Sequence, residues 1–251
     1  MNTVGSDTLV VIGGWGVRCE MLSGLYDRWP GEVIPVSLND ELMAGCDSVS
    51  AVADELLGRF PKPAVWMGWS QGSQIAMAAA ARNTGAVTSL VTVGGFPRFT
   101  ETAGWPSGMP QGEFEAFARG IARDPDRYWM HFLLLMINGD AGEGRARERL
   151  KFWLKQGPPV SGENLVKGLD WLRKEDFRSL WGSPGVPALH LMGEQDVVVR
   201  PWRERSELSG QSCAGVISGM AHWPTGEAAD ECQQVMAEFL AGTREVGQWT
   251  S

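Results

Sequence analysis

One Gly-x-Ser-x-Gly run, Gly68-Trp69-Ser70-Gln71-Gly72, constrains the fold of this chain more than any other feature. The apolar residues 64–67 before it predict a buried strand, and the alanine-rich residues 74–82 after it predict a helix. A chain that turns this sharply from strand to helix holds the serine in a strained conformation, and side chains at Gly68 or Gly72 would collide with the neighbouring backbone. The pattern predicts a nucleophilic Ser70 at a helix N-terminus that favours negative charge. The alternative is a serine that only caps the helix.

Short apolar runs separated by Gly and Pro recur along the chain and alternate with helical patterns. Such continuous runs are typical of strands buried on both faces of a parallel sheet. The alternation predicts an α/β fold with a mostly parallel sheet of about six strands flanked by helices. The expected strands are residues 9–12, 33–36, 64–67, 90–93, 188–192 and 214–217, and the expected helices are 48–59, 71–82, 200–208 and 225–240.

Residues 96–181 interrupt this rhythm, because they are helix-like, rich in Arg, Trp and Phe, and contain no clear strand. The chain has 251 residues, of which 43% are hydrophobic, so it can form one large domain. We therefore expect an α/β core made of residues 1–95 and 182–251, with 96–181 as a helical lid inserted over one end of the sheet.

A nucleophilic serine needs a base, and the chain offers three histidines. His190 lies inside an expected strand, where a hydrogen-bonded core histidine is the usual case, and His131 lies among apolar residues of the insertion. His222 follows the last expected strand in a loop that also contains Gly and Pro. We expect His222 to be the general base for Ser70.

The residue that orients the base is expected to be Asp196, which closes the strand 188–192. The chain order Ser70, Asp196, His222 is the order of a strand-end Ser–acid–His set. Glu194 is the nearest competing carboxylate, and an aspartate that only forms the turn is the structural alternative for Asp196.

The negative oxygen formed during acyl transfer needs preorganised N–H donors. One is expected from the residue after the nucleophile, Gln71, and one from the glycine-rich loop Gly13-Gly14-Trp15-Gly16, where Trp15 is the favoured donor. A phosphate-cradling loop is the competing interpretation, but the loop lacks the G-x-G-x-x-G pattern and the acidic residue that would follow it.

The charge and cysteine content exclude several classes of protein. A net charge of −8 argues against general binding to nucleic acids or anionic membranes. The first residues lack the pattern of a secretory signal, and the four cysteines lack the spacing of a zinc site or a disulfide scaffold, so we expect a cytoplasmic protein without metal or cofactor. Cys19 is expected near the site mouth, either as a reactive thiol or as a half-buried small apolar side chain.

Five short motifs resemble the α/β-hydrolase family: residues 14–16, 68–72, 168–172 with 176–178, 193–196 and 221–224. Within that family the chain looks most like the methyl ester esterases of biotin synthesis that act on pimeloyl-acyl-carrier protein. The resemblance implies a serine carboxylesterase with Ser70 as nucleophile, His222 as base, Asp196 as orienting acid, and the Trp15 and Gln71 amides as the oxyanion hole. A general short-chain carboxylesterase and a non-catalytic hydrolase-fold binding protein are the alternatives.

Two positions depart from the family pattern. Gly13 stands where the family usually has His, which loosens the glycine-rich loop, and Gln71 stands where Leu or Met usually follows the nucleophile. Because only the backbone of Gln71 is required, the consequence expected at that position is a more polar pocket edge.

The insertion carries two further groups of candidate residues. Segment 143–155 is rich in Arg and Lys, and such a positive patch on an acidic chain is suited to an acidic partner such as an acyl-carrier protein. The alternative is a solvated helix face with i,i+4 ion pairs. The expected carrier contacts are Arg145, Arg149 and Lys151. The residues expected to line an acyl tunnel are Trp129, Phe132, Leu133, Phe152 and Trp153, and lid core packing explains each of them as well. The residues expected to bind the substrate are Trp15, Trp129, Phe132 and Trp153.

Overall fold

The apolar runs of the sequence form one six-stranded sheet in the computed structural model, which describes residues 8–201, 208 and 211–242. The strand order is β2-β1-β3-β4-β5-β6, and each neighbouring pair is parallel. The prediction of an α/β fold with about six strands is therefore confirmed. The strands are β1 (Thr8–Ile12), β2 (Glu32–Val36), β3 (Ala64–Trp69), β4 (Val87–Val93), β5 (Ala188–Gly193) and β6 (Ser212–Ile217).

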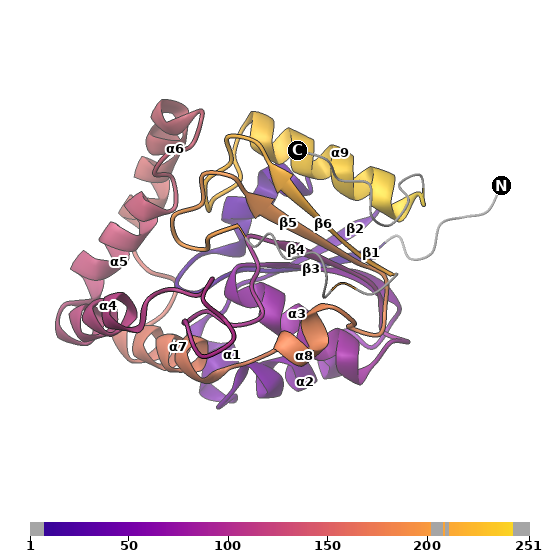
Figure 1. The fold of residues 1–251 in the computed structure, drawn as a ribbon, viewed down its shortest axis with the longest axis horizontal. Coiled ribbons are helices and arrows are strands. Elements are labelled where there is room, and N and C mark those ends of the chain that lie inside the picture. Colours follow the sequence, from indigo (N-terminus) through magenta and orange to yellow (C-terminus); the bar gives the residue numbers. More distant parts are fainter. Residues whose placement is uncertain (1–7, 202–207, 209–210, 243–251) are drawn as a thin grey trace.

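Helices cover both faces of the sheet (Figure 1). On one face lie the short 3-10 helix η1 (Cys19–Leu25) and α9 (Glu227–Leu240), which contact each other. On the other lie α2 (Val49–Arg59), α3 (Gln71–Arg82) and α8 (Arg178–Trp181), while the short helix α1 (Asp40–Ala44) follows β2. The expected helix 200–208 falls mostly on residues outside the described part of the chain.

Helix α3 is buried along almost its whole length, because it lies between the sheet and α2. Its small side chains explain how it fits there: Ala76, Ala78, Ala79 and Ala80 are all fully buried. A helix hydrophobic on all sides belongs in a protein core. This packing holds the N-terminus of α3, and with it Ser70, against the end of β3.

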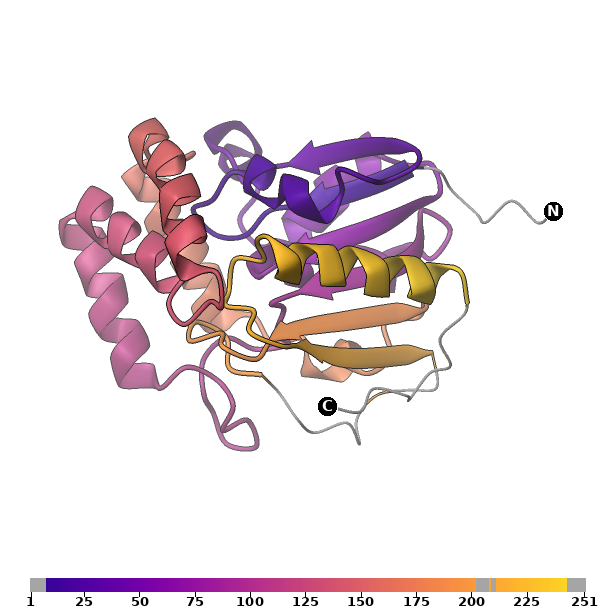
Figure 2. The ribbon, with the colours of Figure 1, turned by 90° about the horizontal axis from the view of Figure 1, so that it is seen from above.

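The insertion between β4 and β5 contains four longer helices, α4 (Gln111–Arg123), α5 (Pro125–Leu135), α6 (Glu143–Gln156) and α7 (Gly162–Lys174). They lie together beyond the end of the sheet to which the strand arrows point (Figures 1 and 2). In open parallel α/β sheets this carboxyl end is where ligands bind. None of the described helices has the length and apolarity that crossing a bilayer requires.

Parallel pairing brings the carboxyl ends of five strands to one edge. The register pairs Ile12 with Gly68, Trp69 with Val93, and Gly193 with Ile217. The loops that follow these strands therefore start side by side, although they are far apart in the sequence. They carry the glycine-rich loop, Ser70, Asp196 and His222.

We predict that the turn at Gly68 tolerates no side chain. A Cβ at Gly68 would overlap the carbonyl group of Gly72 and lie 2.5 Å from the Cα of Ser73. Gly68→Ala should lower the free energy of unfolding, measured by urea denaturation, by at least about 3 kcal/mol, because backbone atoms must move.

The matched control is Gly58→Ala in helix α2, where an added Cβ meets nothing within 4 Å. That substitution should leave stability unchanged or raise it by up to about 1 kcal/mol, because alanine restricts the unfolded chain more than glycine does. Equal effects of the two substitutions would show that the turn is not sterically limited.

Candidate active site

The Ser70 backbone adopts φ 54° and ψ −122°, and among the described residues Ser70 alone is a non-glycine with positive φ. Such conformations cost about 1–3 kcal/mol and persist only where the surroundings enforce them. Here the Ser73 amide donates to the Ser70 carbonyl (2.9 Å) and the Ser73 hydroxyl donates to the Gly68 carbonyl (2.8 Å). The strained turn expected from the Gly-x-Ser-x-Gly run is confirmed.

His222 and Asp196 form a buried pair. Their side chains are both 0% exposed, and His222 Nδ1 lies 2.7 Å from Asp196 Oδ2. The other oxygen, Oδ1, accepts the amides of Val198 and Val199, each at 2.8 Å. An aspartate held this way fixes the imidazole with its Nδ1–H donating, which leaves the lone pair on Nε2. His222 Nε2 is buried and has no hydrogen-bond partner.

The ends of β3 and β4 place this pair beside Ser70. The Ser70 amide donates to the Val93 carbonyl (3.0 Å), and the next residue, Gly94, lies against the pair: a Cβ there would be 3.2 Å from His222 Nδ1 and 3.5 Å from Asp196 Oδ2. The Trp69 indole donates to the His222 carbonyl (2.9 Å). Ser70, Asp196 and His222 thus lie at the same edge of the sheet, and their joint catalytic role stays a prediction.

The other two histidines lie elsewhere. His190 is fully buried in β5, where its Nδ1 lies 2.8 Å from Thr92 Oγ1 and its ring stacks on Trp181 at 4.2 Å. Burial disfavours the charged imidazolium and lowers the pKa of His190 to about 4. His131 is exposed on α5. His190 is thus the core histidine that the sequence suggests.

Glu194 and Cys19 make contacts that support the fold of neighbouring segments. Glu194 Oε2 accepts the Ser218 hydroxyl and the Gly219 amide, both at 3.0 Å, so it braces the loop that carries His222. Cys19 is fully buried, its thiol donates to the Val11 carbonyl (3.2 Å), and burial raises the pKa of the thiol to about 12. Because the thiolate is the reactive form, these observations favour the second expectation for Cys19, a small apolar side chain, over a reactive thiol.

The glycine-rich loop lies against the serine. A Cβ on Gly14 would be 2.9 Å from Ser70 Cβ and 3.5 Å from Ser70 Oγ, so only glycine allows this approach. Gln71 is the first residue of α3, and the first N–H groups of a helix have no acceptor within it. The loop and the helix N-terminus therefore both present backbone beside Ser70 Oγ, an arrangement suited to a developing oxyanion.

The side chain of Gln71 has a role that the sequence did not indicate. It is fully buried, and its Nε2 donates to the Gly168 carbonyl on α7 (3.0 Å), while its Oε1 has no partner. The expectation that this residue makes a pocket edge more polar therefore overlooked a contact with the insertion.

Of the four aromatic residues expected to bind the substrate, three are buried at or beside the glycine-rich loop. Trp15 and Phe132 pack edge to face with ring centroids 5.0 Å apart, and the Trp129 indole donates to the Gly16 carbonyl at 2.6 Å. All three are at most 8% exposed. Trp153 is half-buried and packs edge to face on Phe152, which is 58% exposed, at 4.9 Å.

The basic residues expected to contact a carrier lie on α6. Lys151 pairs with Glu148 (2.6 Å), and Arg145 lies 3.8 Å from Glu227 on α9. The guanidinium of Arg149 lies 5.5 Å from the centre of the Trp223 ring. Lys151 with Glu148, and Arg147 with Glu143 (2.7 Å, i,i+4), are ion pairs within α6, as the alternative expectation has it, whereas Arg145 and Arg149 lie near residues of other elements.

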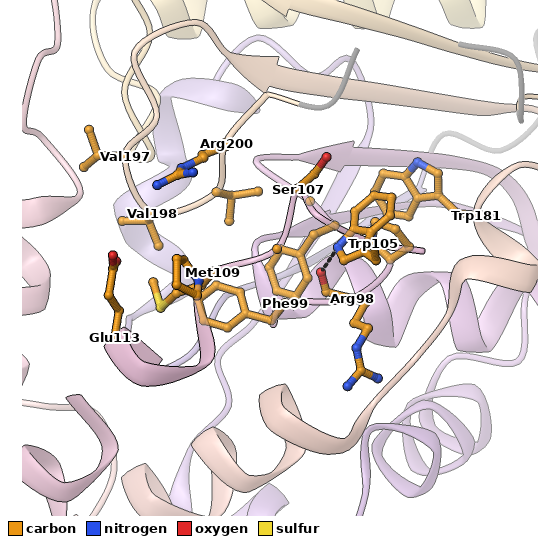
Figure 3. A pocket seen from close by; sticks show the side chains of 16 residues that line it. Arg98, Phe99, Trp105, Ser107, Met109, Glu113, Trp181, Val197, Val198 and Arg200 are labelled. Carbon is orange, nitrogen blue, oxygen red and sulfur yellow. Dashed lines mark hydrogen bonds between the residues drawn. The ribbon is translucent and has the colours of Figure 1, made fainter. Parts of the chain in front are cut away.

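A small cavity of about 30 Å³ lies between the segment after β4 and the residues that follow Asp196 in the chain (Figure 3). The segment after β4 and the residues after Asp196 form its wall, including Phe99, Trp105, Met109 and Val198. A cavity of this size holds about one water molecule. It does not include Trp129, Phe132 or Trp153, so it is not the tunnel expected from the sequence.

The insertion also holds the loop that carries His222, a link that no sequence pattern indicated. The Trp223 amide donates to the Met136 carbonyl and the Ala141 amide donates to the Gly219 carbonyl, both at 2.9 Å. These bonds join backbone groups, so side-chain patterns carry no signal for them.

Comparisons with known proteins agree with this architecture. The model of the alpha/beta hydrolase family matches residues 15–235. The Pimeloyl-(acyl-carrier protein) methyl ester esterase of Sodalis glossinidius is 33% identical over 88% of each chain. The protein of the same name from Methylococcus capsulatus is 33% identical over 94% of this chain and 95% of its own.

Solved structures share the fold at lower identity. An esterase from Exiguobacterium antarcticum superposes with a TM-score of 0.78, covering 95% of this chain and 93% of its own, at 18% identity. An enol-lactonase from Burkholderia xenovorans gives a TM-score of 0.70 at 16% identity over 93% of this chain and 91% of its own. At these identities the similarity establishes the fold alone.

Proposed function

The chain belongs to the alpha/beta hydrolase family, and from this premise we propose that it is a serine carboxylesterase working through an acyl-enzyme on Ser70. The observation that carries the proposal is the buried His222–Asp196 pair at the edge where Ser70 sits in a strained turn. Strain of this kind at a serine is a device for exposing its hydroxyl to a base and a substrate.

The proposed reaction has two steps. His222 Nε2 takes the proton of the Ser70 hydroxyl as Oγ attacks the ester carbonyl, and the Trp15 and Gln71 amides stabilise the resulting oxyanion. The carbon–oxygen bond to the alcohol then breaks, and the alcohol leaves with that proton. Water repeats the sequence on the acyl-enzyme, releasing the carboxylic acid and restoring the Ser70 hydroxyl. Asp196 keeps the imidazole oriented throughout.

The proposed substrate is the methyl ester of pimeloyl-acyl-carrier protein, in biotin synthesis. Support comes from the relatives of that name, which match the chain over most of its length at 33% identity. All four cysteines are free, which suits the reducing cytoplasm where we place the enzyme.

We further propose that residues 96–181 act as a lid over the core formed by 1–95 and 182–251. Its helices α4 to α7 lie over the carboxyl edge of the sheet, and Ser70 beneath them is only 7% exposed. Lids of this kind exclude water and commit the substrate to reaction. In this proposal Trp15, Phe132 and Trp153 border the acyl chain, while Arg145, Arg149 and Lys151 face the carrier.

We predict that Ser70→Ala and His222→Ala each lower the turnover of a p-nitrophenyl ester at least about a thousandfold, because members of a catalytic set act as a unit. The control is His131→Ala, which removes an exposed histidine from α5 and should keep turnover within twofold. If purified, folded His222→Ala retains more than a tenth of the wild-type rate, His222 is not the base.

The substrate is tested by complementation of a biotin-requiring bacterial strain that lacks its pimeloyl-carrier methyl ester esterase. Expression of this chain should restore growth without biotin, and Ser70→Ala, expressed to the same level, should not. A chain that hydrolyses p-nitrophenyl esters yet fails to restore growth would be the general short-chain carboxylesterase. Absence of Ser70 labelling by a fluorophosphonate would favour the non-catalytic binding protein.

Carrier docking is tested by reversing charge on α6. Arg145→Glu with Lys151→Glu should raise KM for the carrier-bound ester and leave a small free ester unchanged, because only the carrier needs the patch. The effect should shrink as salt is raised, since exposed charges are screened beyond about 8 Å at 0.15 M ionic strength. Arg149 is left intact because it covers Trp223, next to His222.

The control for net charge is Arg59→Glu with Lys62→Glu, an equal reversal at the last residue of α2 and in the loop that follows it; α2 lies away from α6 (Figure 1). It should leave KM for the carrier-bound ester unchanged. An equal rise of KM in both double variants would mean that overall charge, and not α6, attracts the carrier.

A further inference from the structure

Three hydrogen bonds connect the insertion to the two residues expected to form the oxyanion hole and to their loop. Trp129 on α5 donates its indole N–H to the Gly16 carbonyl (2.6 Å). In the other direction, Trp15 donates its indole N–H to the Leu165 carbonyl (2.8 Å), and Gln71 donates its side-chain amide to the Gly168 carbonyl (3.0 Å), both on α7. Each is buried and joins residues at least 97 positions apart. We call these three bonds the clamp.

The glycine-rich loop needs such support because of its own composition. Three of its four residues, Gly13, Gly14 and Gly16, are glycines, the residue with the most backbone freedom to lose. Gly16 adopts φ +63°, and a Cβ there would lie 3.3 Å from Trp129 Cδ1 and 3.1 Å from Leu165 Cδ2. The insertion therefore holds this stretch of backbone by packing as well as by the hydrogen bond.

We propose that the insertion positions the oxyanion hole through the clamp, and that Trp129 is a positioning residue for this purpose. The inference rests on the proposed function, since an oxyanion hole matters only if Ser70 performs acyl transfer. Trp129 takes no direct part in the reaction, because its indole N–H already donates to the Gly16 carbonyl. It acts through the loop, by holding the backbone that includes Gly14 against Ser70.

This assignment differs from the role of a tunnel wall in what it predicts. Donors aimed at a developing oxyanion lower the energy of the transition state, so their displacement lowers kcat. A wall residue contacts the acyl chain in ground state and transition state alike, so its loss raises KM. The contacts of Trp129 favour the positioning role, because its indole N–H donates to the Gly16 carbonyl and its ring packs against Gly16.

Helix α7 offers a matched control, because it is also attached to the core away from the oxyanion loop. The Trp171 indole donates to the Asp47 carbonyl (2.9 Å), and Lys167 Nζ donates to the Met43 carbonyl (2.7 Å). Trp171 is as buried as Trp129, at 3% exposed. Replacing either tryptophan by phenylalanine removes one indole N–H bond between insertion and core.

The experiment compares Trp129→Phe with Trp171→Phe in the full-length enzyme. Steady-state kcat and KM are measured with a small p-nitrophenyl ester, together with inhibition by a trifluoromethyl ketone, which forms a tetrahedral oxyanion adduct with a catalytic serine. Trp129→Phe should lower kcat about 10- to 100-fold, with KM within twofold and the inhibition constant raised in parallel. Trp171→Phe should change each value less than twofold.

Trp15→Phe provides a second variant should Trp129→Phe fold poorly. It removes the indole bond to the Leu165 carbonyl and keeps the backbone amide of position 15, and it should also lower kcat more than it raises KM. Equal kcat in Trp129→Phe, Trp15→Phe and Trp171→Phe would overturn the clamp, and so would a raised KM at unchanged kcat in the first two.

Failure of the proposed function gives a different result. In that case the wild-type enzyme itself shows no esterase activity and fluorophosphonate does not label Ser70. If the wild-type enzyme is active and labelled, and Trp129→Phe leaves its kcat unchanged, only the clamp is overturned and the proposed function stands.

Discussion

The close approach of backbone to backbone around Gly72 is the constraint on which the rest of the site depends. A side chain there would overlap the carbonyl of Ile12 at the end of β1 and lie 2.6 Å from the carbonyl of Gly13. Because no side chain separates them, the first turn of α3 lies directly against the start of the glycine-rich loop. One rigid unit therefore contains Ser70, the N-terminus of α3 and the glycine-rich loop. The His222–Asp196 pair is attached to this unit by the pairing of β4, β5 and β6.

Several tryptophans hold segments of the chain together by hydrogen bonds from their indole N–H groups. The sequence has 12, and among the described residues the indole N–H groups of five donate to backbone carbonyls at least 113 positions away: Trp15, Trp69, Trp129, Trp171 and Trp223. A tryptophan buries a large apolar surface and brings one donor that must be satisfied. Each such bond therefore fixes an orientation as well as contributing burial, which suits the joining of an insertion to a core.

The sequence predicts well those parts of the site that depend on local pattern. The strand, turn and helix around Ser70 follow from glycine spacing and from a run of alanines, and Asp196 and His222 follow from their places after apolar strands. Their convergence needs only the rule that parallel strands end at one edge. The catalytic roles themselves stay predictions.

The parts that the sequence does not predict depend on contacts between distant segments. An aromatic residue such as Trp129 gives the same pattern whether it borders a substrate or bonds a loop 113 residues away. The same holds for Gln71, whose side chain finds its partner on α7. In the basic segment, the sequence shows the charges on α6 but not that Arg149 covers Trp223 or that Arg145 lies near Glu227, because those neighbours come from other elements.

The acceptors of the clamp are all main-chain oxygens, those of Gly16, Leu165 and Gly168. Every residue type supplies a carbonyl, so the identity of the side chain at position 165 does not decide whether that acceptor is present while α7 stays helical. Position 168 is restricted to glycine for a different reason, because a Cβ there would lie 2.6 Å from Cδ1 of the Trp15 ring. The clamp thus depends on the side chains of its three donors, and it places no requirement on the exposed side chains of the insertion. A lineage can therefore retune what its insertion binds by mutation of exposed positions without disturbing the chemistry beneath.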